Sequence, residues 1–128
     1  MVLSKYIAEA EKFYREALKE FEAGKRERND ARIRDSAEKA WNAIVQATNY
    51  LFEREGLPIP ASHHERRRGL IELARKNMWF REMGFLDRYM ARIGNLHESC
   101  FHEGIYDLEL LEEEFKKVKS FMEDVKKV

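Results

Sequence analysis

The sequence has few residues that cross-link a chain or anchor it in a membrane. Its 128 residues include one cysteine, Cys100, which excludes an intramolecular disulfide and a cysteine-rich zinc site. Charged residues interrupt every apolar stretch before it reaches membrane-spanning length, and the start, Met1 to Lys5, lacks the apolar run of a signal peptide. These absences predict a protein of a reducing, cytoplasmic compartment with no membrane partner.

Neither sign of charge is in excess. Twenty-four Lys and Arg balance 24 Asp and Glu, so the bulk charge indicates neither tight nucleic-acid binding nor a membrane-surface role. The run Arg66-Arg67-Arg68 is a local cluster that could contact RNA phosphates, although such a run is more often a solvated helix face. Abundant Glu, Lys and Arg with a single Gln is also typical of thermophile proteins.

Prolines and β-branched residues are scarce, whereas good helix formers are abundant, so we expect an all-α chain. Apolar residues recur at three- and four-residue spacing in five segments. The predicted segments are Ser4 to Gly24, Ile33 to Gly56, Ser62 to Asn77, Trp79 or Phe85 to Phe101 with a bend at Gly84, and Asp107 to Val125. Short connections predict an antiparallel up-and-down helical bundle of four long helices and one shorter one, in a single domain over residues 1–128.

The fourth predicted helix contains a histidine within its apolar stripe. On a helical wheel, His97 lies inside the apolar arc, Arg92 lies at the rim, and Asn95 points roughly the other way. One interpretation is a core histidine that is hydrogen-bonded to a neighbouring carbonyl, with Arg92 as a solvated edge residue. The other is a two-residue site for RNA cleavage.

The RNA-cleaving hypothesis gives each of the two residues a role. A histidine partly withdrawn from water stays largely neutral near pH 7 and can take a proton from a ribose 2′-hydroxyl. The guanidinium of Arg92 can stabilise the charge that develops on the phosphate. Because Arg92 and His97 are five residues apart, they converge only at the margin of a cleft, at a local break near Gly94, or across a dimer interface.

The remaining histidines do not predict a metal site. His97 and His102 are one residue further apart than the two histidines of a zinc-protease helix, and a spacing of five rotates them apart on an α-helix. His63 and His64 lie in the first turn of a predicted helix, where adjacent histidines are usually exposed. We therefore expect no metal and no cofactor, and we interpret Cys100 as a small core residue.

Three segments of the chain together resemble the HEPN superfamily. Residues 92–97 (Arg-Ile-Gly-Asn-Leu-His) have its Arg-x4-His form. Residues 35–43 (Asp-Ser-Ala-Glu-Lys-Ala-Trp-Asn-Ala) look like the second-helix signature of its PaREP branch, and residues 96–104 resemble the Leu-His-x-x-Phe-Tyr-Glu-like run of that branch. The resemblance spans most of the chain. It implies a helical bundle that forms a homodimer, in which the arginine and histidine of both subunits line a shared cleft.

Catalytic members of the superfamily are metal-independent endoribonucleases that leave a 2′,3′-cyclic end. The resemblance therefore assigns proton transfer to His97 and phosphate stabilisation to Arg92, with Asn95, Glu98 and His102 as supporting polar groups. Many members are toxins that pair with a nucleotidyltransferase-like antitoxin, so the expected partners are RNA or a nucleotide and such an antitoxin.

Ile93 keeps a second class of function open. Active members usually have a polar residue directly after the arginine, and this chain has Ile93 there. The alternative is a non-catalytic helical dimer that binds a nucleotide or serves as a protein-interaction scaffold.

Overall fold

The computed structural model describes residues 4–128, and over these residues the chain is helical with no strand. The elements are α1 (Lys5–Glu27), α2 (Asp30–Arg54), α3 (His63–Lys76), α4 (Met78–Met83), α5 (Phe85–Arg92), the π-helix η1 (Ile93–His102) and α6 (Leu108–Val125). This confirms the all-α prediction. Of the predicted start of the chain, Met1 to Leu3 lie outside the described residues. Between residues 4 and 128, no helix has both the length and the apolar character needed to cross a bilayer.

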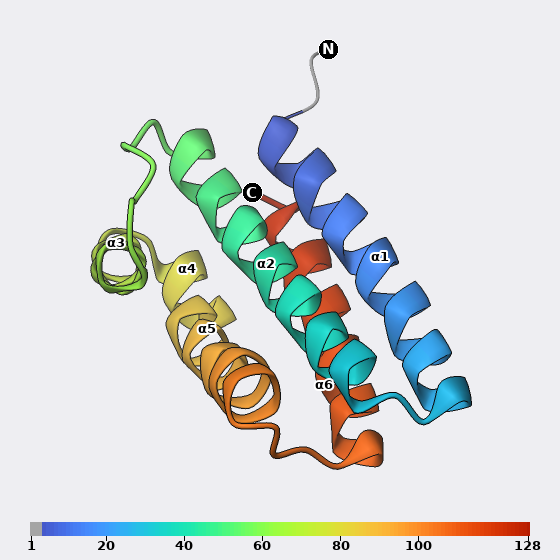
Figure 1. The fold of residues 1–128 in the computed structure, drawn as a ribbon. Helices are drawn as coiled ribbons and strands as arrows, with labels where there is room; N and C mark the ends of the chain where they lie inside the picture. The colour runs from blue at the N-terminus through green and yellow to red at the C-terminus, as the bar shows by residue number, and fades with distance from the viewer. Residues whose placement is uncertain (1–3) are drawn as a thin grey trace.

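The long helix α2 is the centre of the bundle (Figure 1). It runs antiparallel to α1, and it also contacts α6 and η1. The short helix α3 is seen end-on in Figure 1, so it crosses the direction of α1 and α2 instead of running alongside them. Large side chains on α2, including Trp41 and Phe52, are buried in the core. α2 therefore shares one side with α1 and α6 and another with η1 and α3.

Side-chain caps begin α3 and α6 where the sequence predicts them, and Ser4 likewise caps α1 by accepting from the N–H of Tyr6 at 3.1 Å. The Ser62 Oγ accepts a hydrogen bond from the backbone N–H of Glu65 at 3.1 Å, and the Glu65 carboxylate accepts from the N–H of Ala61 at 2.9 Å. The Asp107 Oδ1 accepts from the N–H of Leu110 at 3.1 Å. These bonds satisfy N–H groups that have no partner within their helix. The predicted starts of α3 and α6 are therefore confirmed.

The first helix is longer than the sequence predicts. It continues past Gly24 to Glu27, and Arg28 takes the left-handed conformation after it, with φ 52°. Gly24 is buried, and a Cβ there would lie 2.8 Å from the Cγ1 of Ile33 on α2. Gly24 therefore permits a close approach of two helices and does not end the first one.

The fourth predicted helix breaks at Gly84, as predicted, and then changes type. Gly84 has a φ of 64° and separates α4 from α5. The segment η1 is a π-helix, in which N–H groups bond to the carbonyl five residues earlier, and at its end the Glu103 N–H donates to the Glu98 carbonyl at 3.0 Å. These wider turns bring residues five apart onto one face of the helix. Helical segments of this type are rare and often lie at functional sites.

Candidate functional site

A carboxylate–imidazole pair lies between α2 and η1. The Nδ1 of His97 is 2.7 Å from Oε1 and 3.1 Å from Oε2 of Glu38. Because an ionised carboxylate only accepts hydrogen bonds, His97 donates from Nδ1, and the neutral ring has its lone pair on Nε2. The side chain of His97 is 21% exposed. The residue is therefore neither sealed in the core nor free in solvent.

His102 approaches His97 from the same face of η1. The two Nε2 atoms are 3.2 Å apart, and the ring centroids are 4.4 Å apart at an angle of 80°. Arg34 on α2 holds this end of η1, because its guanidinium donates to the carbonyls of Phe101 (2.8 Å and 3.0 Å) and His102 (3.0 Å). The expectation that a spacing of five rotates the two histidines apart is therefore wrong, since the backbone here is a π-helix and not an α-helix.

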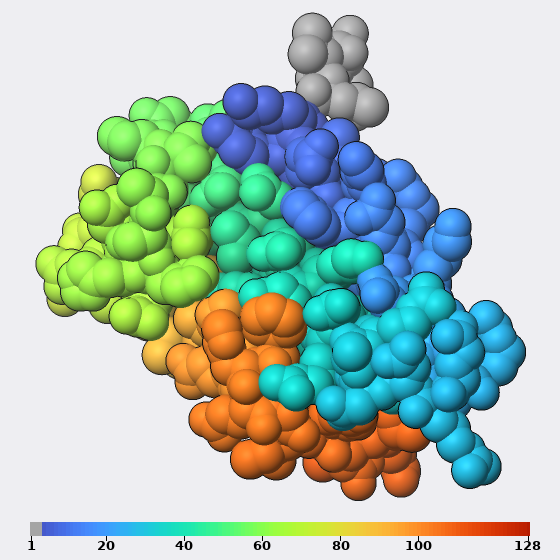
Figure 2. Space-filling view, viewed as in Figure 1, coloured from blue at the N-terminus to red at the C-terminus, as the bar shows by residue number. Residues whose placement is uncertain are grey.

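Aromatic side chains surround His97 on several sides. The ring of Trp41 lies 6.0 Å away, the ring of Phe101 stacks at 6.3 Å, and the ring of His63 meets it edge-on at 5.6 Å. These residues come from α2, η1 and α3. The surfaces of the three elements meet on the face in Figure 2, in teal, orange and yellow-green. We refer to Glu38, His63, His97 and His102 as the histidine cluster.

A buried arginine on α3 fixes the proton position of His63. The Nε of Arg66 donates to the Tyr89 hydroxyl at 2.9 Å, and its Nη2 donates to the Nδ1 of His63 at 2.9 Å. Since a guanidinium cannot accept, the neutral ring of His63 has its proton on Nε2. Burial lowers the pKa of His63 below its ordinary value, and the positive charge of Arg66 lowers it further. His63 is therefore neutral near pH 7.

Arg92 and Asn95 lie on another side of the same helical segment. Arg92 is buried, with its Nε 2.5 Å from Oε2 of Glu114 and its Nη2 donating to Oε1 at 3.3 Å. The Asn95 Nδ2 donates to the same Oε1 at 2.8 Å. Glu114 belongs to α6, whereas the partner of His97 belongs to α2. The structure therefore brings His97 together with His102 but holds Arg92 and Asn95 against a different helix.

The other residues singled out from the sequence differ in exposure. Arg66 is buried, Arg67 is half-buried, and Arg68 and Glu98 are exposed. Only part of the arginine run therefore faces solvent. Cys100 is fully buried, and burial raises the pKa of its thiol to about 12. The interpretation of Cys100 as a core residue is confirmed, and its thiolate is scarce at neutral pH.

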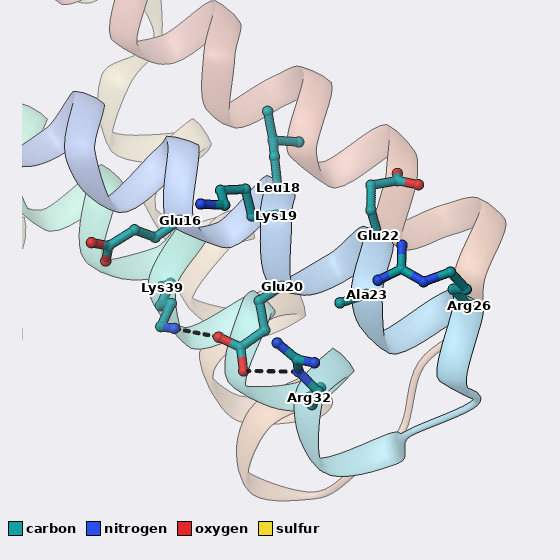
Figure 3. Close-up of a pocket in the computed structure, with 9 residues that line it drawn as sticks. All are labelled: Glu16, Leu18, Lys19, Glu20, Glu22, Ala23, Arg26, Arg32 and Lys39. Carbon is teal, nitrogen blue, oxygen red and sulfur yellow. Dashed lines mark hydrogen bonds and ion pairs between the residues drawn. The ribbon is translucent and has the colours of Figure 1, made fainter.

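A hollow of about 650 Å³ lies between α1 and α2, outside the histidine cluster (Figure 3). Charged side chains from both helices line it and pair with one another. The Glu20 carboxylate binds the ammonium of Lys39 and lies 3.8 Å from the Nε of Arg32. None of the residues lining the hollow belongs to the histidine cluster. The candidate site is therefore the cluster and not this hollow.

Two members of the cluster were not predicted as site residues. Glu38 is next to Ala37 and three residues before Trp41, so it lies at the edge of the apolar stripe of its helix. A carboxylate at such an edge is the signal that could have identified it. His63 was expected to be exposed, but it is half-buried because Arg66 and Tyr89 bind its ring.

No protein-family model, no curated protein and no solved structure matches this chain. Its function is therefore inferred from the chemistry of the histidine cluster.

Proposed function

We propose that this protein is a HEPN-like, metal-independent endoribonuclease in which His97 accepts the proton. The observation that supports this proposal is the bond of 2.7 Å between the His97 Nδ1 and the Glu38 carboxylate. A carboxylate in this position fixes the tautomer and orientation of the ring and stabilises the cation formed when Nε2 takes a proton. These are the properties of a general base at neutral pH.

In the proposed reaction, the Nε2 of His97 removes the proton of a ribose 2′-hydroxyl. The 2′-oxygen attacks the adjacent phosphorus, a 2′-O–P bond forms, and the bond from phosphorus to the 5′-oxygen breaks. Protonated His102 turns its exposed ring away from His97 and donates a proton to the leaving 5′-oxygen. The products are a 2′,3′-cyclic phosphate and a 5′-hydroxyl. The 3.2 Å contact between the two Nε2 atoms then returns the proton from His97 to His102.

Positive charge for the phosphate comes from α3 in this proposal. The hydrogen-bond partners of Arg66 are Tyr89 and neutral His63, so neither compensates its charge. The half-buried Arg67 follows it, and the Nε2–H of His63 is a further donor. Donors fixed in a site of this kind stabilise the charge that develops on a phosphate. Arg92 takes part only if it leaves Glu114.

The test is a cleavage assay on end-labelled single-stranded RNA in the presence of EDTA. Wild type should cut and leave 2′,3′-cyclic ends, and His97→Ala should lower the rate about 100-fold or more, the usual size of an acid–base contribution. His64→Ala is the matched control, because His64 is an exposed histidine in the first turn of the same helix as His63, and it should cut at the wild-type rate. Equal cleavage by wild type and His97→Ala would remove the assignment.

A second candidate function is a non-catalytic helical dimer that binds a nucleotide or a protein partner. The burial of Arg92 against Glu114 favours it, because the arginine of the Arg-x4-His motif is then withheld from phosphate. Both candidates include the homodimer, whereas the nucleotidyltransferase-like partner that the resemblance implies belongs to the nuclease. A dimer in sedimentation at micromolar concentration, together with intact RNA after incubation with wild type, would favour the scaffold.

A further inference from the structure

We infer that His97 and His102 bind a divalent transition-metal ion of the zinc type, with Glu38 as the group that orients His97. One potential ligand atom from each of the three residues lies within 4.8 Å of the other two. The residues come from α2 and from the two ends of one turn of η1, so the site depends on the π-helical backbone. The proposal does not depend on RNA cleavage, because it concerns the binding of an ion to these side chains.

The separation of the two imidazoles suits chelation. A tetrahedral zinc ion with Zn–N distances of about 2.0–2.1 Å holds two ligand nitrogens about 3.3 Å apart. The Nε2 atoms of His97 and His102 are 3.2 Å apart. Two imidazoles at this distance can therefore bind one ion with little change of the backbone.

Glu38 prepares His97 for this role. A histidine that binds a metal usually donates its other ring N–H to a carboxylate, which fixes the tautomer and raises the basicity of the ligand nitrogen. The Glu38 carboxylate accepts from the Nδ1 of His97 at 2.7 Å, so the lone pair of Nε2 is directed toward His102. In this arrangement the two Nε2 atoms bind the ion directly, Glu38 orients one of them, and water completes the coordination.

The position of His102 is also set by the fold. Arg34 donates to the carbonyls of Phe101 and His102 and thereby holds the end of η1 against α2. The ring of His102 is exposed, so an ion reaches the site from solvent. The backbone that presents the second ligand is therefore ordered before an ion binds.

The ligand set selects a class of metal. Imidazole nitrogens suit zinc, copper and nickel, whereas magnesium prefers an octahedral shell of oxygen ligands. Both Nε2 atoms must be unprotonated to bind, so affinity should fall as the pH is lowered. An ion on the Nε2 of His97 would also occupy the lone pair that accepts the proton in RNA cleavage. Inhibition of cleavage by zinc is the one part of this inference that rests on the proposed function.

The experiment is calorimetric titration of the full-length, EDTA-treated protein with zinc chloride at neutral pH, in the absence of RNA. Wild type should bind one ion per chain, and magnesium chloride should give no binding heat. His97→Ala and His102→Ala should each weaken zinc binding by at least about tenfold, and Glu38→Gln should weaken it about 10- to 100-fold, the usual effect of removing an orienting group. His64→Ala should bind as wild type does. Cobalt should give the visible absorption of a tetrahedral ion in wild type and not in His102→Ala.

Far-UV circular dichroism of each variant shows whether its helices are intact, and His102→Ala is the safest variant because the ring is exposed. Equal zinc affinity in wild type and His102→Ala would overturn the site, and so would the absence of zinc binding by wild type. Zinc binding without RNA cleavage would support the metal site and contradict the nuclease. RNA cleavage without zinc binding would support the nuclease and contradict the metal site.

Discussion

Removal of Arg92 from its buried ion pair with Glu114 should destabilise the protein, and this can be measured directly. Their side chains are 7% and 10% exposed, with Nε and Oε2 2.5 Å apart. Removing one member of a buried pair leaves the other charge without compensation and costs about 3–5 kcal/mol. The Glu114 carboxylate keeps a hydrogen bond from Asn95 at 2.8 Å after Arg92 is removed. We therefore expect Arg92→Met to lower the free energy of unfolding by about 3 kcal/mol, the lower end of this range.

A double substitution separates the loss of the pair from the loss of the arginine. Arg92→Met combined with Glu114→Leu removes both charges from the same buried space, and such replacements are often neutral or stabilising. Asn95 then loses its acceptor, but it is exposed and water can replace the bond. The double variant should therefore be more stable than Arg92→Met alone.

The assay is urea unfolding followed by far-UV circular dichroism for wild type, both single variants and the double variant. If Arg92→Met lowers the free energy of unfolding by less than about 1 kcal/mol, the effect is that of an exposed ion pair and not of a buried one. That result would refute the structural role of Arg92 and would indicate that its guanidinium is free to bind a phosphate.

Two further predictions concern His63 and the glycines. The folded protein binds a proton at His63 more weakly than the unfolded chain does, because folding lowers the pKa of this residue from 6.5. The free energy of unfolding should therefore decrease as the pH falls below 6.5, and it should level off below the pKa of His63 in the folded protein. His63→Gln should flatten this decrease in unfolding experiments between about pH 7.5 and pH 5, whereas His64→Gln should keep it; identical profiles for wild type and His63→Gln would contradict the assignment. Gly94→Ala should stabilise the protein by about 0.4–1 kcal/mol, since a Cβ there meets no atom within 4 Å. Gly69→Ala should destabilise it by about 1–3 kcal/mol, because its Cβ would lie 2.5 Å from the Cζ of Phe52; the opposite order of the two melting temperatures would show that the space around these glycines is not as described.

The predictable parts of this fold depend on contacts within a few residues. Ser62 and Asp107 each bind an N–H three residues further along the chain, so the sequence alone is enough to place them as caps. The prediction that a helix ends at Gly24 is wrong, because the role of this glycine depends on Ile33, a residue of the next helix. The spacing of apolar residues shows which face of a helix is buried, but not what that face meets.

The candidate site was predictable in part. The sequence identified His97 as a polar residue within an apolar stripe, but its partner Glu38 is 59 residues away. An α-helical wheel does not contain the π-helix either, and Arg34, which binds the carbonyls at the end of this helix, lies 67 residues or more away in the sequence. Without that backbone, an α-helical wheel separates His97 from His102. The pairing of Arg92 with α6 is likewise a tertiary contact that a helical wheel does not contain.

The most direct test of the site is the protonation pattern of the His97 ring, measured by ¹H–¹⁵N correlation spectra of the histidine side chains at neutral pH. The signals are assigned by comparison with His97→Ala and His102→Ala. We expect the neutral ring of His97 to hold its proton on Nδ1, with an unprotonated Nε2, and we expect Glu38→Gln to shift the Nδ1 signal. A neutral His97 with its proton on Nε2, unaffected by Glu38→Gln, would contradict both the general base and the metal ligand proposed for this residue.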